Sequence, residues 1–126
     1  MKILVASDIH GNLENTKALI NKFHEYKADR LIILGDIYPG YSYEDSLEMA
    51  NLFSHICTKL YLLRGNCDNS YFDRHSPVGL LDEFNMKIND RNIYFNHGHR
   101  GFPSVEFKEN DIYCHGHTHI NDISLY

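Results

Sequence analysis

Five clusters of polar residues in this sequence have side chains suited to chemistry, and each stands directly after an apolar run. The clusters are Asp8 and His10, Gly35-Asp36, Gly65-Asn66, His97-Gly98, and Gly116-His117-Thr118-His119. A separation of two residues on an extended segment places both members of a pair on one side of the chain. This spacing applies to Asp8 with His10 and to His117 with His119, so each pair can reach one ligand together.

The donor atoms in these clusters predict a site for two metal ions. Carboxylate, imidazole and amide oxygen ligands together suit divalent ions, manganese first, with nickel, iron or zinc as alternatives. The carboxylates are too few for a calcium cage, and Cys57, Cys67 and Cys114 lack the spacing of a zinc ribbon. The chain has nine histidines, and five of them lie within the last thirty residues. That concentration favours metal binding.

Each cluster also has a structural explanation. Asp8 and His10 could cap a following helix, and Asp36 and Asn66 could be turn residues after their glycines. The Gly-His-Thr-His segment that ends at His119 is the hardest to explain in this way. The combination of all five at predicted strand ends favours a functional site over five separate structural roles.

The first half of the chain alternates predicted strands and helices. The strands are Lys2–Ser7, Arg30–Leu34 and Lys59–Leu63, and the helices run from Asn12 to about Tyr26 and from Ser42 or Tyr43 to about His55. In the second helix, Leu47, Ala50 and Leu52 are expected to face the core. The alternation predicts βαβ units and a parallel sheet. Ligands bind outside the carboxyl ends of such strands, which is where the polar clusters stand.

The second half of the chain is mostly strand. The predicted strands are Phe84–Ile88, Ile93–Asn96, Asp111–Cys114 and Ile120–Tyr126, with a hairpin turn at Asn89-Asp90-Arg91-Asn92. These strands predict a mixed or antiparallel sheet packed beside the first sheet.

Length and composition limit the class of protein. A chain of 126 residues predicts a single domain, residues 1–126. Its apolar runs are far shorter than the roughly 20 residues that cross a bilayer, so no membrane association is expected. A net charge of −5 does not favour an extended nucleic-acid surface. Met1-Lys2 opens directly into a strand without a signal peptide, and the odd cysteine count indicates a reducing, cytoplasmic setting.

Taken together, these motifs resemble those of the calcineurin-like metallophosphoesterase family. The matching segments are Asp8-Ile9-His10, Gly35-Asp36, Gly65-Asn66-Cys67-Asp68, His97-Gly98-His99 and Gly116-His117-Thr118-His119. The cysteine after Gly-Asn resembles the small bacterial and archaeal phosphodiesterase subfamily. The resemblance runs from residue 3 to residue 119 and implies a four-layer α-β-β-α sandwich with two metals at the strand ends.

The resemblance also implies the role of each residue. One metal would take Asp8, His10, Asp36 and His119, the other would take Asp36, Asn66, His97 and His117, and Asp36 would bridge the two. The catalytic residues implied are Asp36, Asn66, Cys67 and His97. His99 and His115 match no ligand position.

Two features depart from the family pattern. Cys67 stands where many members have a histidine that assists the leaving group. The chain ends seven residues after His119, whereas family members continue through further strands. We therefore expect a second sheet truncated at its C-terminal part, with either a longer natural form or a homo-oligomer formed through Ile120, Ile123 and Leu125.

The expected activity is hydrolysis of a small phosphate diester by a hydroxide held between two divalent ions. The alternative is a non-catalytic scaffold or binding protein on the same fold. Retention of every matched ligand disfavours the scaffold. The short acidic chain disfavours a DNA-processing nuclease, and Cys67 disfavours a protein phosphatase.

Overall fold

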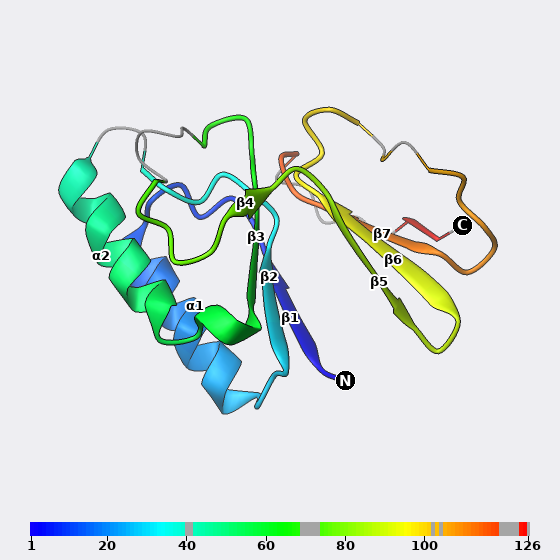
Figure 1. Cartoon of the computed structure of the whole chain (residues 1–126), viewed down its shortest axis with the longest axis horizontal. Coiled ribbons are helices and arrows are strands. Elements are labelled where there is room, and N and C mark those ends of the chain that lie inside the picture. Colours follow the sequence, from blue (N-terminus) through cyan, green and yellow to red (C-terminus); the bar gives the residue numbers. More distant parts are fainter. Residues whose placement is uncertain (40–41, 69–73, 102, 104, 119–123, 126) are drawn as a thin grey trace.

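The computed structural model describes residues 1–39, 42–68, 74–101, 103, 105–118 and 124–125. Its elements are β1 (Ile3–Ala6), α1 (Leu13–Glu25), β2 (Arg30–Ile33), α2 (Tyr43–Ser54), a 3₁₀ turn η1 (Cys57–Lys59), β3 (Leu60–Leu63), β4 (Leu80–Leu81), β5 (Phe84–Ile88), β6 (Arg91–Asn96), β7 (Ile112–His115) and β8 (Ser124–Leu125). They form two four-stranded sheets, ordered β1-β2-β3-β4 and β5-β6-β7-β8. Figure 1 shows α1 and α2 on one side of the first sheet and the second sheet on its other side.

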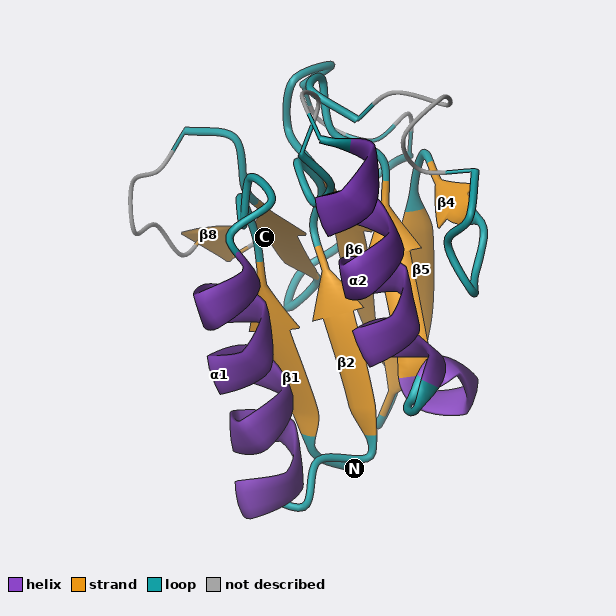
Figure 2. Cartoon of the chain, turned by 90° about the vertical axis from the view of Figure 1, so that its left-hand side faces the viewer, coloured by secondary structure: helices purple, strands orange, loops and turns teal. Residues whose placement is uncertain are grey.

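The first sheet is parallel throughout, as the alternation of strand and helix predicted. Its central strand β2 is buried on both faces, which requires a continuous apolar run. Leu31 and Ile33 face the helices and pack with Phe23 of α1 and Phe53 of α2. Ile32 faces the second sheet and belongs to the same apolar cluster as Phe95 of β6. Figure 2 shows both helices on the near side of the first sheet, with β1 and β2 visible between them.

Both helices begin at capping residues, of which the sequence predicted Asn12 as a cap and gave Ser42 as one of two possible starts of the second helix. The Asn12 side chain accepts the N–H of Asn15 at 2.9 Å, and Ser42 Oγ accepts the N–H of Asp45 at 3.2 Å. Each cap satisfies a backbone donor that the first turn of a helix leaves without a partner. The caps therefore fix the residue at which each loop after a strand ends and the helix that runs back along the sheet begins.

The buried face of α2 shares only Ala50 with the prediction, because Leu47 and Leu52 both lie outside the buried set. Leu47 was expected in the core, but 40% of its surface is exposed, and that prediction is wrong. The buried residues of the helix are Ser46, Met49, Ala50 and Phe53. They follow the i, i+3, i+4, i+7 spacing of a single helical face, and Leu47 lies outside that face. Ser46 occupies a position of the buried face at which a helical pattern predicts an apolar residue.

The second sheet is mixed, as predicted. β5 and β6 are antiparallel, β6 and β7 are parallel, and β7 and β8 are antiparallel. The hairpin turn is shorter than the four residues expected, because β6 already begins at Arg91. Asn89 and Asp90 both have positive φ, 50° and 65°, as a two-residue hairpin turn requires. β4 was not predicted, since two residues carry no periodic signal.

The α/β fold class is confirmed, with a helical layer and two facing sheets. Within the described residues, no helix covers the outer face of the second sheet. Phe107, from the loop after β6, lies there instead, with its ring 5.0 Å from that of Tyr94 and 6.2 Å from that of Tyr113. Neither described helix is long and apolar enough to cross a membrane. Ile120 and Ile123 lie outside the described residues.

The position of the α2 core face predicts two contrasting substitutions. Met49→Ala removes a side chain with no exposed surface, so it should lower the free energy of unfolding by about 2–5 kcal/mol. Leu47→Ala, two residues away on the same helix, should change it by less than about 1 kcal/mol. Urea unfolding of the metal-free protein measures both values. Equal losses from the two substitutions would contradict the assigned face.

Candidate metal centre

The loops that follow the strands are joined to one another by backbone hydrogen bonds. The N–H groups of Asp8, His10 and Gly11 donate to the carbonyls of Gly35, Asp36 and Ile37, at 3.0, 2.8 and 2.9 Å. In the second sheet, the N–H of Gly116 donates to the carbonyl of His97 at 2.9 Å. The loops therefore continue the pairing of their strands past the end of each sheet and carry their side chains in fixed register.

Four of the candidate residues have a left-handed backbone. The φ angles of Asp8, His10, Asp36 and His117 are 57°, 50°, 52° and 69°. Such a conformation costs a non-glycine residue of order 1–3 kcal/mol, and it is concentrated at functional sites. The neighbouring Gly65 must lack a side chain, because a Cβ there would collide with the Asp36 carboxylate. The backbone is thus shaped around the Asp36 side chain.

Asp36 is the centre of the cluster. Its side chain is buried, and its Oδ1 accepts the N–H of Cys67 at 2.8 Å. Its Oδ2 lies 3.6 Å from His10 Nε2 and 3.2 Å from His97 Nε2. A single carboxylate oxygen therefore lies between imidazoles that come from different sheets.

His97 directs Nε2 at this carboxylate. Its Nδ1 lies 2.8 Å from the carbonyl oxygen of Leu34, which can only accept, so Nδ1 carries a proton, and the tautomer selected by this bond keeps its lone pair on Nε2. Nε2 is 2.8 Å from Asn66 Oδ1, which is another acceptor. The same amide oxygen lies 3.0 Å from His117 Nδ1. Lone pairs of carboxylate, amide and imidazole thus converge on one point.

Such a convergence of acceptors fits a divalent cation. Two sets of possible ligand atoms are present, and within each set all the atoms lie within 4.8 Å of one another. The first set comes from His10, Asp36 and Cys67, and the second from Asp36, His97 and His117. Asp8 adds its Oδ1 to the centre, 3.7 Å from His10 Nε2. Its Oδ2 is held by the Ser7 hydroxyl at 2.6 Å and the N–H of His117 at 2.9 Å. His119, the remaining predicted ligand, lies outside the described residues.

Comparison with known proteins assigns the family. The sequence profile of the calcineurin-like phosphoesterase superfamily domain matches residues 1–125. The chain belongs to the calcineurin-like phosphoesterase superfamily. It is therefore a metal-dependent phosphoesterase, and the family resemblance read from the motifs is confirmed.

Relatives of this phosphoesterase occur in bacteria and archaea. Phosphodiesterase YfcE of Escherichia coli is 30% identical over 133 residues, which cover 95% of this chain and 70% of YfcE. A phosphodiesterase of Methanocaldococcus jannaschii is 25% identical over 129 residues, which cover 94% of this chain and 74% of that protein. The solved structure of YfcE, described as a phosphoesterase, has a TM-score of 0.80 at 26% identity and covers 94% of this chain and 70% of YfcE. The match to YfcE confirms the subfamily.

Asp68 is a residue of this phosphoesterase to which the motif gave no role. Its carboxylate accepts the backbone N–H groups of Asp36, Ile37, Tyr38 and Gly65, at 2.9, 2.8, 3.3 and 2.7 Å. Burial raises the pKa of Asp68, and the donated N–H groups of Gly65, Ile37 and Tyr38 act in the opposite direction. The side chain ties the loop after β2 to the loop after β3. In the sequence, an aspartate three residues after a glycine indicates a turn. Nothing in the sequence indicates that this aspartate also accepts hydrogen bonds from the distant loop after β2.

Two further histidines, His99 and His115, pack against aromatic rings near the candidate ligands and belong to neither set of candidate ligand atoms. The ring of His99 packs 5.3 Å from that of His97, and its buried Nδ1 has no hydrogen-bond partner. Burial, with His97 and Arg100 nearby, lowers the pKa of His99 and favours its neutral ring. His115 stacks on Tyr113 at 5.0 Å.

The Cys67 thiol is exposed beside Asp36. Burial, followed by the negative charge of Asp36, raises the pKa of Cys67 and favours the protonated thiol. The Asn66 side-chain N–H donates to its Sγ at 3.5 Å. Cys67 therefore borders the candidate ligands as a neutral group.

The four hydrogen bonds of Asp68 predict a structural and a functional loss on substitution. Asp68→Asn replaces one accepting oxygen with an NH₂ group that faces backbone N–H donors. It should lower the free energy of unfolding by about 2–4 kcal/mol, since hydrogen bonds to charged groups contribute about 1.5–3 kcal/mol each. It should also weaken metal binding, because Asp36 loses its support. Urea unfolding and calorimetric titration with Mn²⁺ measure the two effects.

The matched control is Asp90→Asn in the exposed hairpin turn, where the positive φ of 65° suits asparagine equally well. This variant should retain both the stability and the metal affinity of the parent. Parental values for Asp68→Asn as well would show that Asp68 does not support the centre.

Proposed function

We propose that this phosphoesterase hydrolyses phosphate diesters at a centre for two divalent metal ions that share Asp36. The observation that carries the proposal is the position of Asp36 Oδ2, 3.6 Å from His10 Nε2 and 3.2 Å from His97 Nε2. The diester class is supported by the relatives from Escherichia coli and Methanocaldococcus jannaschii, both of which are phosphodiesterases by name.

The residues divide into two ligand sets around Asp36. Asp8 and His10 would hold one ion, with His119 as the further ligand of that set. Asn66, His97 and His117 would hold the other. The mixture of oxygen and nitrogen donors favours manganese, with nickel, iron or zinc as alternatives. The close approach of acceptor atoms supports this division. His97 Nε2 lies close to both Asn66 Oδ1 and Asp36 Oδ2, and a cation bound among these atoms would relieve the repulsion between their lone pairs.

Asp8, His10, Asp36, Asn66, His97 and His117 would hold two divalent ions, which when bound would lower the pKa of a water molecule and neutralise charge on the phosphate. The chain's own residues make that chemistry possible. Asp8 and Asp36 bring two negative charges, so the loaded site keeps a positive charge and attracts an anionic ester. The hydrogen bond from His97 Nδ1 to Leu34 fixes the ring so that Nε2 faces the centre, as second partners of metal-binding histidines do.

Cys67 limits the choice of leaving group. Its Sγ lies within 4.8 Å of ligand atoms of His10 and Asp36, where a departing alkoxide would need a proton. A thiol with an ordinary pKa of about 8.5 is a weaker acid than imidazolium at about 6.5, and its pKa is raised further in this protein. Diesters whose leaving group departs as a stable anion are therefore the preferred substrates. We place the activity on small phosphate esters in the cytoplasm, where the three free cysteines remain thiols.

Asp36→Asn tests the shared ligand. The variant should bind no more than one ion. Loss of a residue that only hydrogen-bonds a metal ligand lowers metal affinity by about 10–100-fold, so loss of the shared ligand itself should lower it further. In the parent, anomalous scattering should locate two ions about 3.5–4 Å apart. Calorimetric titration with Mn²⁺ gives the stoichiometry of each protein.

The control is Asp29→Asn, which changes a carboxylate at the opposite end of the first sheet and should leave two bound ions. Asp29 accepts the N–H of Lys2 and lies outside the centre. A single tetrahedral ion bound only by the Gly-His-Thr-His segment would overturn the proposed centre.

Substitution of Cys67 tests the role of the leaving group. Cys67→Ser should change the cleavage of aryl diesters only modestly, because these leaving groups need no proton. Cys67→His should increase cleavage of alkyl diesters more than that of aryl diesters, by up to about 10²–10⁴-fold, the usual contribution of general acid catalysis. The measurement is kcat/KM for diesters whose leaving groups have graded pKa values.

Cys57→Ser in the 3₁₀ turn η1 is the matched control and should leave the whole series unchanged. If Cys67→Ser abolishes aryl-diester cleavage while both ions remain bound, Cys67 is an essential catalytic group and this account of it fails.

A further inference from the structure

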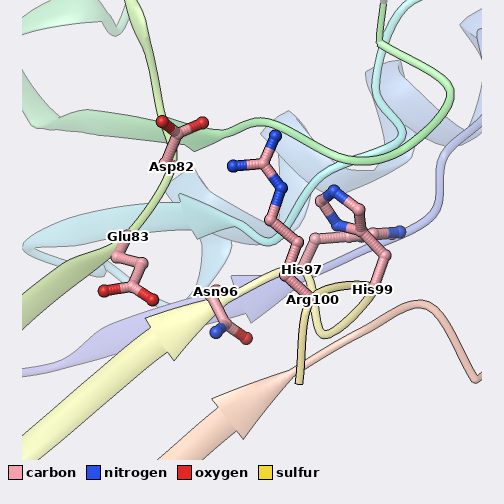
Figure 3. Close-up of a pocket in the computed structure, with 6 residues that line it drawn as sticks. All are labelled: Asp82, Glu83, Asn96, His97, His99 and Arg100. Carbon is pink, nitrogen blue, oxygen red and sulfur yellow. The ribbon is translucent and has the colours of Figure 1, made fainter. Parts of the chain in front are cut away.

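A cavity of about 260 Å³ opens beside the metal centre and shares His97 with it. Asp82 and Glu83, from the segment that connects the two sheets, form one wall. Asn96, His99 and Arg100, at and after the end of β6, line the opposite side with His97. Figure 3 shows the two carboxylates on one side of the cavity and the Arg100 side chain with the histidines on the other.

Among the described residues, the charged side chains of this cavity form no ion pair with one another, whereas Asn96 and His97 are hydrogen-bonded to other parts of the protein. Within the described part of the chain, no ion pair joins Arg100 to Asp82 or Glu83. The buried Nδ1 of His99 has no hydrogen-bond partner. Two carboxylates that can only accept and one guanidinium that can only donate therefore face a shared space with their hydrogen-bonding capacity available.

The wall that carries His99 and Arg100 is held in place from the outer face of the second sheet. The Asn96 side-chain N–H donates to the carbonyl of Gly101 at 3.0 Å, which closes the loop 97–101. The Tyr113 hydroxyl donates to Asn96 Oδ1. Asn96 is 4% exposed, so these hydrogen bonds are shielded from water. The cavity is therefore bounded by a positioned loop.

We propose that this cavity is the subsite for the ester substituent that the enzyme retains, and that the substituent is a hydroxyl-rich group such as ribose. The inference rests on the proposed diesterase function. A phosphate held at the metal centre places one substituent on the Cys67 side as the leaving group. The other substituent extends past His97 into the cavity. Asp82, Glu83 and Arg100 are then specificity-determining residues for the retained alcohol.

Hydroxyl groups match this lining better than other substituents do. Each hydroxyl both donates and accepts, so vicinal hydroxyls can bond a carboxylate on one wall and the guanidinium on the other. An aryl group would leave all three charged groups without hydrogen-bond partners, and a quaternary ammonium group, which has no N–H donor and no acceptor, could form no hydrogen bond to either wall. A volume of about 260 Å³ lies just below the range of about 300–1,000 Å³ typical of ligand sites, which suits a sugar ring.

The experiment compares diesters that share one leaving group. Each substrate releases p-nitrophenolate as water adds to phosphorus, and the substrates differ only in the retained substituent: methyl, phenyl, choline or uridin-5′-yl. With Mn²⁺-loaded protein, the uridinyl ester should exceed the methyl ester in kcat/KM by about tenfold or more, as one or two hydrogen bonds to charged groups provide. The choline and phenyl esters should show no such preference.

Substitution of the walls should remove the preference and leave the chemistry intact. Arg100→Gln, and separately Asp82→Asn with Glu83→Gln, should bring the uridinyl ester down to the methyl ester, while the methyl ester changes by less than about twofold. Arg91→Gln, in the hairpin at the other end of the second sheet, is the charge-matched control for Arg100→Gln. Asp90→Asn removes one carboxylate from the same hairpin, and both controls should keep the preference.

A binding measurement separates the cavity from the metal centre. Uridine, which carries no phosphate, is titrated into the metal-free protein and followed by the NMR resonances of the His99 ring and the Arg100 side chain. Both should shift in the parent and in Arg91→Gln, but not in Arg100→Gln.

The possible failures are distinguishable. Metal-dependent cleavage of the methyl ester without a uridinyl preference, or a preference for choline or phenyl, would overturn the subsite and leave the diesterase intact. If the metal-loaded protein cleaves none of the diesters, the diesterase proposal fails and this inference fails with it.

Discussion

The hydrogen bond between His97 and the Leu34 carbonyl is the interaction on which the rest of the centre depends. This hydrogen bond of 2.8 Å joins the loop after β2 in the first sheet to the end of β6 in the second sheet. The His97 side chain has no exposed surface. The bond fixes the position of one sheet edge relative to the other. It also places a proton on Nδ1, so Nε2 faces Asp36 and Asn66 as a candidate metal ligand. One contact thus sets both the architecture and the chemistry.

The geometry that suits a metal opposes the stability of the protein without metal. Four left-handed residues and a group of facing acceptors each have a cost in free energy, which the hydrogen bonds from the His117 N–H to Asp8 and from the Cys67 N–H to Asp36 offset only in part. The remaining compensation comes from around the cluster. Asp68 gathers the N–H groups of the loops, and the apolar clusters on both faces of β2 hold the strands. Binding a cation to the folded state would add stability by mass action.

The sequence predicted those parts of the structure that local physics determines. The continuous apolar runs identified β1, β2 and β3, the side chain of Asn12 identified the start of α1, and the start of α2 was predicted at Ser42 or Tyr43. Convergence of the clusters followed from the general position of ligands at parallel strand ends. The misplaced Leu47 and the undetected β4 have a different origin. In both cases tertiary packing decides the outcome, through a buried Ser46 in α2 and through pairing of Leu80 with Leu62.

The residues missed in the site show where sequence reasoning ends. Asp68 acts on backbone groups about thirty positions earlier, and the cavity brings Asp82 close to Arg100 from separate segments. These relations belong to the connections between strands. The candidate metal ligands, in contrast, sit at the strand ends, where the sheet itself fixes their spacing. Under the proposed function, the strand ends would activate a phosphate ester at this edge, whereas the connecting segments would determine which ester fits. Loop residues could then alter the choice of substrate while the candidate ligands at the strand ends stay the same.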